Sequence, residues 1–219
     1  MAAPLTAWSY SRAADYAQCP LRFKLKHIDK IQEPPSAAMA RGRDIHKEAE
    51  LFVLGKGPLT DSLKKFEDLV TELAAFPGVA AELKAGFTRH WKKTGYFAKD
   101  VWLRAVFDIF LPYADDTALV ADFKTGKRYA SNDEQVELFA LAAMCFAPNV
   151  KTVETRLWYL DTGEEEIAEF DATQRDALIS KWEAKVAPMF NDSVFAPRPN
   201  DKCRFCHFSK SRLNLCKFG

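Results

Sequence analysis

Two neighbouring stretches of the chain have the character of β-strands, and the second of them restricts the fold most. The stretches "VWLRAVFDIFL" (101–111) and "ALVADFK" (118–124) are separated by the turn residues "ADDT", a pattern that predicts a β-hairpin. Side chains two residues apart on a strand point to the same face. We therefore expect Asp122 and Lys124 on one face of the second strand, with Leu119, Ala121 and Phe123 on the other.

A carboxylate also interrupts the first strand, where Asp108 follows an apolar run. A charge in a central strand is costly unless it is paired or bound to a metal, and the hairpin would bring Asp108 near Asp122. Two carboxylates and a lysine at a sheet edge suit Mg²⁺ or Mn²⁺ and metal-dependent phosphodiester hydrolysis. The alternative, from these residues alone, is a buried Asp108 or Asp122 in a salt bridge with Lys124.

The same carboxylate-x-lysine spacing occurs at Glu82–Lys84 and Glu183–Lys185. Both pairs lie in stretches that we expect to be helical, where residues two apart point in different directions. We therefore predict that these pairs are solvated surface residues.

His46 and Gln135 are two further candidates on predicted helices. His46 lies one turn after Gly42, a small residue that would let a ligand or another backbone approach. Gln135 heads an apolar stripe at a helix start, and the turn at Gly126 would place it near the end of the Asp122–Lys124 strand, where its amide could bind a phosphate. Each has a purely structural alternative when taken alone.

The order of elements predicts the fold class. Helices, a hairpin, a helix, a second hairpin and a helix indicate one α/β or α+β domain over residues 1–219 with a mixed central β-sheet flanked by helices. The expected helices cover 9–28 (broken at Cys19-Pro20), 38–55, 61–76, 79–92, 131–146 and 173–189, and the second hairpin covers 153–160 and 164–170.

The charge distribution is asymmetric although the net charge is only +1. Residues 9–30 carry +3 and residues 198–219 carry +5, so the rest of the chain carries −7. Basic ends suit a polyanion if folding brings them together; otherwise they are two solvated termini. No apolar run approaches the ~18 residues of a membrane span, and the first residues lack a secretion signal. We therefore expect a cytoplasmic protein with no membrane partner.

Four of the five cysteines have metal-site spacing. Cys145 lies in an apolar stretch and is predicted to be a core residue. The others are one early residue and three near the C-terminus: Cys19, Cys203, Cys206 and Cys216. A C-x₂-C pair with a third cysteine nearby is typical of metal sites, and a disulfide scaffold is not expected in a cytoplasmic chain. Four thiolates could hold Zn²⁺ or a 4Fe–4S cluster.

Together these motifs resemble the PD-(D/E)XK nuclease superfamily, and within it the RecB-like branch of CRISPR adaptation nucleases and AddB-type iron–sulfur nucleases. "GRDIHKE" is similar to the branch's G-x-x-x-H motif, "VFDIF" to its central aspartate, "ADFKTGK" to D-x-K-T-G and "QVELF" to Q-x-x-x-Y. Phe139 stands where the last motif has tyrosine, and Ala105 where many relatives have glycine. "SYSRAADYAQCPLRF" and "CRFC…C" are similar to the branch's terminal cysteine segments.

The resemblance implies a restriction-endonuclease-like fold and a site in which His46, Asp108 and Asp122 hold Mg²⁺ or Mn²⁺. Lys124 and Gln135 would complete the catalytic set. It also favours a 4Fe–4S cluster over zinc at the four cysteines, joining segments 9–31 and 198–219.

The implied function is a metal-dependent deoxyribonuclease, acting on single-stranded DNA or duplex ends in recombination, repair or CRISPR-type processing. Protein partners from recombination or CRISPR adaptation would accompany such a role. The alternatives are a structure-selective endonuclease and a non-catalytic iron–sulfur or zinc DNA-binding module.

Overall fold

The computed structural model describes residues 5–114, 116–126, 128 and 131–219. The chain divides into two compact units, one formed by Met1–Pro34 with Lys181–Gly219 and the other by Pro35–Ser180. Both segments that were expected to be joined through cysteines therefore belong to the first unit. The single domain over residues 1–219 stays a prediction.

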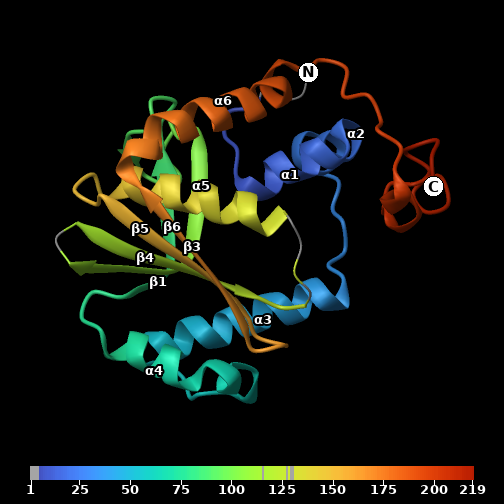
Figure 1. The fold of residues 1–219 in the computed structure, drawn as a ribbon. Helices are drawn as coiled ribbons and strands as arrows, with labels where there is room; N and C mark the ends of the chain where they lie inside the picture. The colour runs from blue at the N-terminus through green and yellow to red at the C-terminus, as the bar shows by residue number, and fades with distance from the viewer. Residues whose placement is uncertain (1–4, 115, 127, 129–130) are drawn as a thin grey trace. The chain divides into compact units, whose positions relative to one another are not determined.

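The second unit is built on one six-stranded sheet in the order β2-β1-β3-β4-β5-β6 (Figure 1). β4 and β5 run parallel and the other neighbours run antiparallel, so the prediction of a mixed sheet is confirmed. The strands are β1 (Ala80–Phe87), β2 (Lys93–Thr94), β3 (Leu103–Ala114), β4 (Thr117–Lys124), β5 (Thr152–Tyr159) and β6 (Glu164–Asp171).

Helices cover both faces of this sheet, which confirms the predicted α/β architecture (Figure 1). On one face lie α3 (Ala37–Val53), the 3₁₀ helix η2 (Asp61–Phe66) and α4 (Glu67–Ala75). Ile45 and Leu63 from these helices pack with Ile109 and Phe123 of the sheet in one buried apolar cluster. Full burial of each such side chain stabilises the fold by about 1.5–3 kcal/mol.

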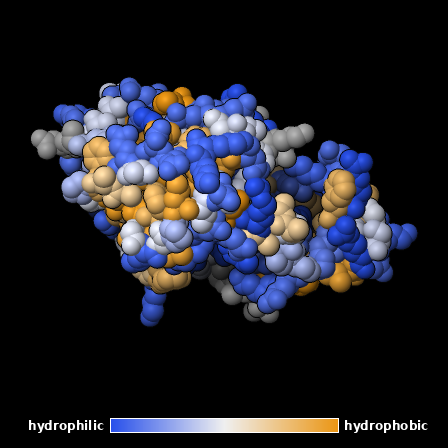
Figure 2. All heavy atoms as spheres, turned by 90° about the horizontal axis from the view of Figure 1, so that it is seen from below, coloured by the Kyte–Doolittle hydropathy of each residue, from blue (hydrophilic) through white to orange (hydrophobic). Residues whose placement is uncertain are grey.

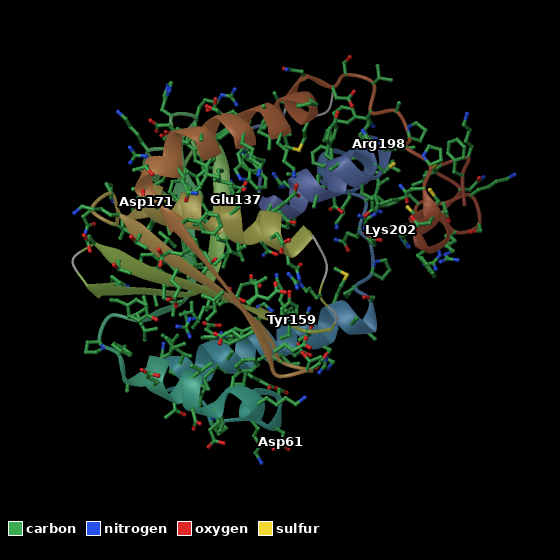
Figure 3. The ribbon with its side chains drawn as sticks, in the orientation of Figure 1. Asp61, Glu137, Tyr159, Asp171, Arg198 and Lys202 are labelled. Atoms are coloured by element: carbon green, nitrogen blue, oxygen red, sulfur yellow. The ribbon has the colours of Figure 1, made fainter. Side chains whose placement is uncertain are left out.

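The opposite face is covered by α5 (Ser131–Phe146). Val136 packs against Leu157 and Tyr159 of β5, and the Asn132 amide donates to the Tyr159 hydroxyl at 3.0 Å. Tyr159 is labelled in Figure 3 at the end of its strand. These contacts fix the start of α5 beside the end of the sheet that carries Lys124, which pairs with Tyr159 in the β4–β5 ladder.

Local sequence explains how the helix with His46 is placed. The Ser36 hydroxyl accepts from the Met39 amide at 3.2 Å and caps the N-terminus of α3, as N-cap serines do. Ile45, Ala49 and Val53 repeat every four residues and form its buried stripe. His46 follows Ile45 and thus lies beside the buried stripe rather than within it.

The prediction of a helix over residues 79–92 is wrong, because the region contains strand β1. Its alanines, Glu82, Leu83 and Lys84 favour a helix locally, but pairing with β3 overrides that preference. Gly86 is needed there, since a Cβ at this position would lie 2.7 Å from the Gly95 carbonyl oxygen. Glu82 is therefore a strand residue.

The first unit contains α1 (Tyr10–Gln18), α2 (Pro20–Phe23), a π-helical turn η1 (Lys24–Ile28), η4 (Asp201–Phe205) and the later part of α6 (Arg175–Asn191), which follows the short η3 (Ala172–Gln174). The predicted break at Cys19-Pro20 is confirmed, because Cys19 is extended at φ −163° and Pro20 opens α2. Trp8 and Trp182 are buried and stack with ring centroids 5.8 Å apart.

Hydrophilic side chains cover much of the face seen in Figure 2, with apolar side chains gathered in places. Within the described part of the chain, no helix is both long enough and apolar enough to span a membrane.

Candidate active site

Asp122, Lys124 and Gln135 form a closed polar group at the end of β4. The Lys124 ammonium lies 2.5 Å from Asp122 Oδ2 and donates to Gln135 Oε1 at 2.6 Å. The Gln135 amide in turn donates to Asp122 Oδ1 at 3.1 Å. The predicted proximity of Gln135 to the D-x-K strand is confirmed, and its contacts fix the direction of both β4 side chains.

His46 of α3 meets Asp108 of β3, the strand that lies next to β4 in the sheet. His46 Nδ1 lies 3.0 Å from Asp108 Oδ2, and the same oxygen accepts from the Phe123 backbone amide at 2.8 Å. Burial by itself would lower the pKa of His46, but the hydrogen bond and charge of Asp108 outweigh it and raise the pKa to about 9. Asp108 is thus tied to both α3 and β4.

Glu82 joins His46 and Asp108, although the sequence interpretation treated it as a solvated surface residue. In the described part of the chain, this trio is the set in which three metal-binding atoms lie within 4.8 Å of one another. Glu82 lies opposite Asp108, between the paired residues Ala81–Ile109 and Leu83–Phe107. Its φ of +51° is in the left-handed region, and such strain concentrates at functional sites.

The carboxylates of the site repel one another. Burial, followed by the charge of Asp108, raises the pKa of Asp122, and the same two causes raise the pKa of Glu82. A hard divalent cation favours carboxylate oxygen donors of this kind and would offset the repulsion. The donor set therefore fits Mg²⁺ or Mn²⁺, with Asp122 beside the trio and paired to Lys124.

An open groove leads over α3 to His46 and Glu82. Gly42 lies in its wall close to Thr125, since a Cβ there would be 3.1 Å from the Thr125 hydroxyl and would require that side chain to shift. Arg43 and Lys47 also line the groove; their side chains are 71% and 58% exposed and pair with the exposed or partly exposed carboxylates of Asp44 and Glu50. The groove thus offers cations to an anionic ligand beside the carboxylates.

Asp161 holds the loop that follows Lys124. Its Oδ2 accepts from the Gly126 backbone amide at 2.8 Å and from Arg41 of α3 at 3.0 Å. Lys65 donates to the Asp161 carbonyl oxygen. The hydrogen bond from Arg41 is the main reason that the pKa of Asp161 is lowered. One carboxylate therefore links the loop after β4 to the helix that carries His46.

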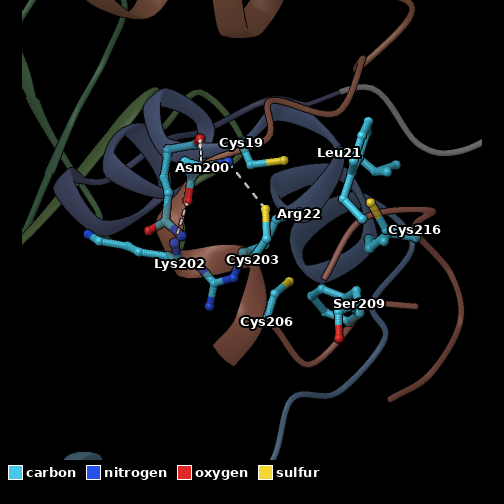
Figure 4. Close-up of a pocket in the computed structure, with 13 residues that line it drawn as sticks. Cys19, Leu21, Arg22, Asn200, Lys202, Cys203, Cys206, Ser209 and Cys216 are labelled. Atoms are coloured by element: carbon cyan, nitrogen blue, oxygen red, sulfur yellow. Dashed lines mark hydrogen bonds between the residues drawn. The ribbon is translucent and has the colours of Figure 1, made fainter. Parts of the chain in front are cut away.

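Four thiols of the first unit line one small cavity: Cys19, Cys203, Cys206 and Cys216 (Figure 4). None forms a disulfide. Backbone amides of Arg198 and Asn200 donate to the sulfurs of Cys19 and Cys203, each at 3.4 Å. Among the described residues, no three of these thiols lie within 4.8 Å of one another, so they do not form a compact cluster. Cys145 lies elsewhere and is buried, as predicted.

Comparison with known proteins decides the family. The sequence model of the PD-(D/E)XK nuclease superfamily matches residues 7–101 and 74–211, which together cover most of the chain. The chain belongs to the PD-(D/E)XK nuclease superfamily. No curated protein matches the sequence.

Among solved structures, this superfamily member is similar to a protein from Eubacterium rectale that is named as a proposed exonuclease. The TM-score is 0.53 at 12% identity, with 91% of this chain and 88% of that chain covered. The crystal structure named SSO0001 has 14% identity and a TM-score of 0.47 over 95% and 86% of the two chains. At these identities the first likeness shows the fold alone.

Two departures from the motifs of this superfamily member have structural explanations. Phe139, in place of the motif tyrosine, is 6% exposed and meets Phe107 edge to face at 5.7 Å. Ala105 is buried in β3, where it pairs with Ala85. Both positions are part of the buried core. The polar site consists of His46, Glu82, Asp108, Asp122, Lys124 and Gln135, and neither departure changes one of these residues.

Proposed function

We propose that this superfamily member is a Mg²⁺- or Mn²⁺-dependent deoxyribonuclease that acts on single-stranded DNA or duplex ends. The observation that carries the proposal is the convergence of His46, Glu82 and Asp108 beside the Asp122–Lys124–Gln135 group. Structural ion pairs alone do not explain a strained, half-buried Glu82 held against the buried carboxylate of Asp108.

Each side chain has a distinct role in this proposal. His46, Asp108 and Asp122 hold the cation, as the sequence motifs predict, and Glu82 adds a fourth donor. When bound, a divalent cation polarises the phosphodiester and lowers the pKa of a coordinated water. Lys124 then donates to the attacking oxygen or to the charge that develops on the phosphate. Gln135 keeps Lys124 aimed at that position through its 2.6 Å hydrogen bond.

The groove over α3 supports a nucleic-acid substrate. Arg43 and Lys47 can meet backbone phosphates on either side of the bond that is cut. These contacts do not read base sequence, so we expect cleavage with little sequence preference. The DNA strand would lie along α3 in this groove, and Gly42 lets Thr125 pack closely against the helix.

The basic ends of the chain contribute unequally to DNA contact. In the N-terminal segment, Arg22 forms ion pairs with Asp15 and Glu33, and Lys24 pairs with Asp29. Among the described residues of 198–219, no arginine or lysine forms an ion pair with a carboxylate, and all six of these cations are exposed. We therefore assign the DNA contact of the first unit to the C-terminal segment.

The four cysteines are proposed to hold a 4Fe–4S cluster that joins segments 9–31 and 198–219. Their arrangement around one cavity supports a shared metal group. Tetrahedral zinc with bonds of about 2.3 Å needs all four sulfurs about 3.8 Å apart, whereas no three of these thiols lie within 4.8 Å of one another among the described residues. A cluster binds each thiolate to a different iron and keeps the sulfurs farther apart. Such a centre would belong to a RecB-like nuclease of a reducing, cytoplasmic compartment.

Digestion of end-labelled linear DNA and covalently closed circular DNA, with Mn²⁺ and with chelator, tests the proposed activity. We expect the linear substrate to be degraded only with Mn²⁺ and the closed circle to survive. Cleavage of the closed circle would instead indicate a structure-selective endonuclease with the same chemistry. Binding without cleavage of either substrate would indicate a non-catalytic DNA-binding module.

A further inference from the structure

The connection between β1 and β3, residues 88–102, is strongly basic and is called the basic hairpin below. Its cations are Arg89, Lys92, Lys93 and Lys99, with His90 between them, against the single acid Asp100. All five of these side chains are exposed. None of them forms an ion pair among the described residues, and Asp100 accepts from the Thr94 hydroxyl at 2.9 Å.

The basic hairpin is rigid because aromatic residues anchor it. Trp91 and Trp102 are buried and meet edge to face at 5.5 Å. The Trp102 amide donates to the Phe87 carbonyl at 2.7 Å, and the Thr88 amide to the Lys92 carbonyl at 2.8 Å. A surface built this way presents its outer side chains without much further loss of conformational entropy.

An aromatic pair projects from this rigid frame. Phe97 is 78% exposed, so its ring face is accessible to a ligand. Tyr96 supports it edge to face at 4.9 Å. The Arg104 guanidinium lies 5.6 Å from the Tyr96 ring and 6.0 Å from the Phe97 ring, fixed by a 2.9 Å hydrogen bond to the Tyr96 carbonyl.

A groove beside the hairpin carries further positive charge. It is lined by His90, Lys92 and Lys93 together with Arg175, and its apolar wall includes Phe146. Lys93 lies 3.6 Å from the Phe146 ring centroid, which holds its ammonium at the edge of the groove. An acidic residue, Asp176, also lines it, so the cations outnumber the acids.

We propose that the basic hairpin is a second, non-catalytic binding surface for single-stranded nucleic acid. Cations that follow a phosphate backbone and an exposed ring that stacks on a base are the two elements of sequence-independent single-strand binding. Duplex DNA would use the cations alone, because its bases already stack on one another. The inference takes DNA as the nucleic acid from the proposed function, but needs no cleavage.

Fluorescence anisotropy of labelled oligothymidine of about 20 nucleotides, longer than the ~4–16 nucleotides of typical single-strand sites, tests the inference in EDTA. We expect Phe97→Ala to weaken binding about tenfold, within the range for loss of one stacked base. Binding of a blunt duplex should stay unchanged. Ile167→Ala is the matched control, since Ile167 is an apolar side chain 58% exposed on β6.

The charge contribution is tested with Lys92→Ala/Lys93→Ala. The slope of log affinity against log salt should become shallower by about 1.4, because each of the two lost phosphate contacts to a single strand contributes about 0.7. Lys64→Ala/Lys151→Ala removes equal charge from exposed lysines that pair with Asp61 and Asp116, and should leave that slope unchanged.

Three results would overturn the inference: no binding of oligothymidine by the unaltered protein, wild-type affinity of the Phe97 and lysine variants, or equal losses in the controls. Wild-type cleavage of DNA together with any of them would leave the proposed nuclease standing. Binding that depends on the basic hairpin, in a protein that does not cleave DNA, would support the inference and contradict the proposed nuclease.

Discussion

Glu82 and Asp108 lie opposite each other in the β1–β3 pair, and with His46 they place three metal-binding atoms within 4.8 Å. Two carboxylates at this distance repel each other in the cation-free protein, and Glu82 adopts a left-handed φ of +51° to reach the position. The repulsion and the strained backbone thus destabilise the cation-free fold at the site where a cation would bind.

Glu82→Gln should therefore raise stability and lower activity together. We expect the cation-free variant to gain about 1 kcal/mol in free energy of unfolding, because one of the repelling charges is gone. Its Mn²⁺ affinity and cleavage rate should both fall about tenfold. Urea unfolding, Mn²⁺ titration and cleavage assays measure the three effects. Glu72→Gln, on the exposed surface of α4, is the control, and identical behaviour of the two variants would exclude Glu82 from the site.

Asp161→Ala should slow cleavage without unfolding the protein. The side chain is 34% exposed, so its ion pair with Arg41 stabilises the fold by less than about 1 kcal/mol. Loss of its hydrogen bond to Gly126 should let the loop after Lys124 move and reduce the cleavage rate about tenfold, since small misplacements are costly in catalysis. Asp116→Ala breaks a comparable surface ion pair with Lys151 and should cleave at the wild-type rate. Equal rates for both variants would contradict the positioning role.

Replacing Cys206 should remove a metal centre, whereas replacing Cys145 should not. Protein purified without oxygen is expected to be brown, with about four iron and four sulfide per chain. Cys206→Ala should lose iron and unfold at lower urea, because metal binding contributes directly to folding. Cys145→Ala should keep its iron. Stoichiometric zinc without sulfide would replace the cluster with a zinc site, and a metal-free, fully stable protein would remove both.

Asp15 should make the first unit sensitive to acid. Burial would raise the pKa of Asp15, but the hydrogen bond from His27 and the charges of Arg22 and Lys26 hold the pKa at about 2. Because the pKa is lowered by folding, the stabilisation is present above the ordinary value of 3.8 and is lost as pH falls through about 2. Asp15→Asn should thus be about 2 kcal/mol less stable than wild type at pH 6, and the difference should shrink steadily below pH 4. Asp68→Asn, at an exposed position of α4, should show no such pH-dependent difference.

Five of the six site residues, all except Glu82, could be predicted from the sequence, because their motifs are local or lie on strands that are adjacent in the chain. Asp122 and Lys124 lie on one short strand, and Gln135 lies near the start of the next helix. Because β4 is followed directly by α5, the order of elements alone predicts that Asp122, Lys124 and Gln135 lie close together. The helix that carries His46 could also be predicted, because its apolar residues repeat with helical spacing.

Glu82 and Asp161 could not be predicted because long-range pairing decides their environment. The sequence around Glu82 favours a helix by propensity, and only the ladder with β3 makes it a strand. Asp161 lies in the turn after β5 and reaches Gly126 only because β4 and β5 run parallel. Strand propensity depends strongly on such neighbours.

Mn²⁺ binding and DNA cleavage measured side by side on Asp108→Ala and Lys124→Ala test the metal-dependent site most directly. We expect Asp108→Ala to lose both Mn²⁺ binding and cleavage. Lys124→Ala should bind Mn²⁺ like wild type but cleave at least about a hundredfold more slowly, since it removes only charge stabilisation in the transition state. Lys56→Ala, at an exposed position, should match wild type in both. Wild-type cleavage by either site variant, or undiminished cleavage in excess chelator, would contradict a metal-dependent nuclease centred on Asp108 and Lys124.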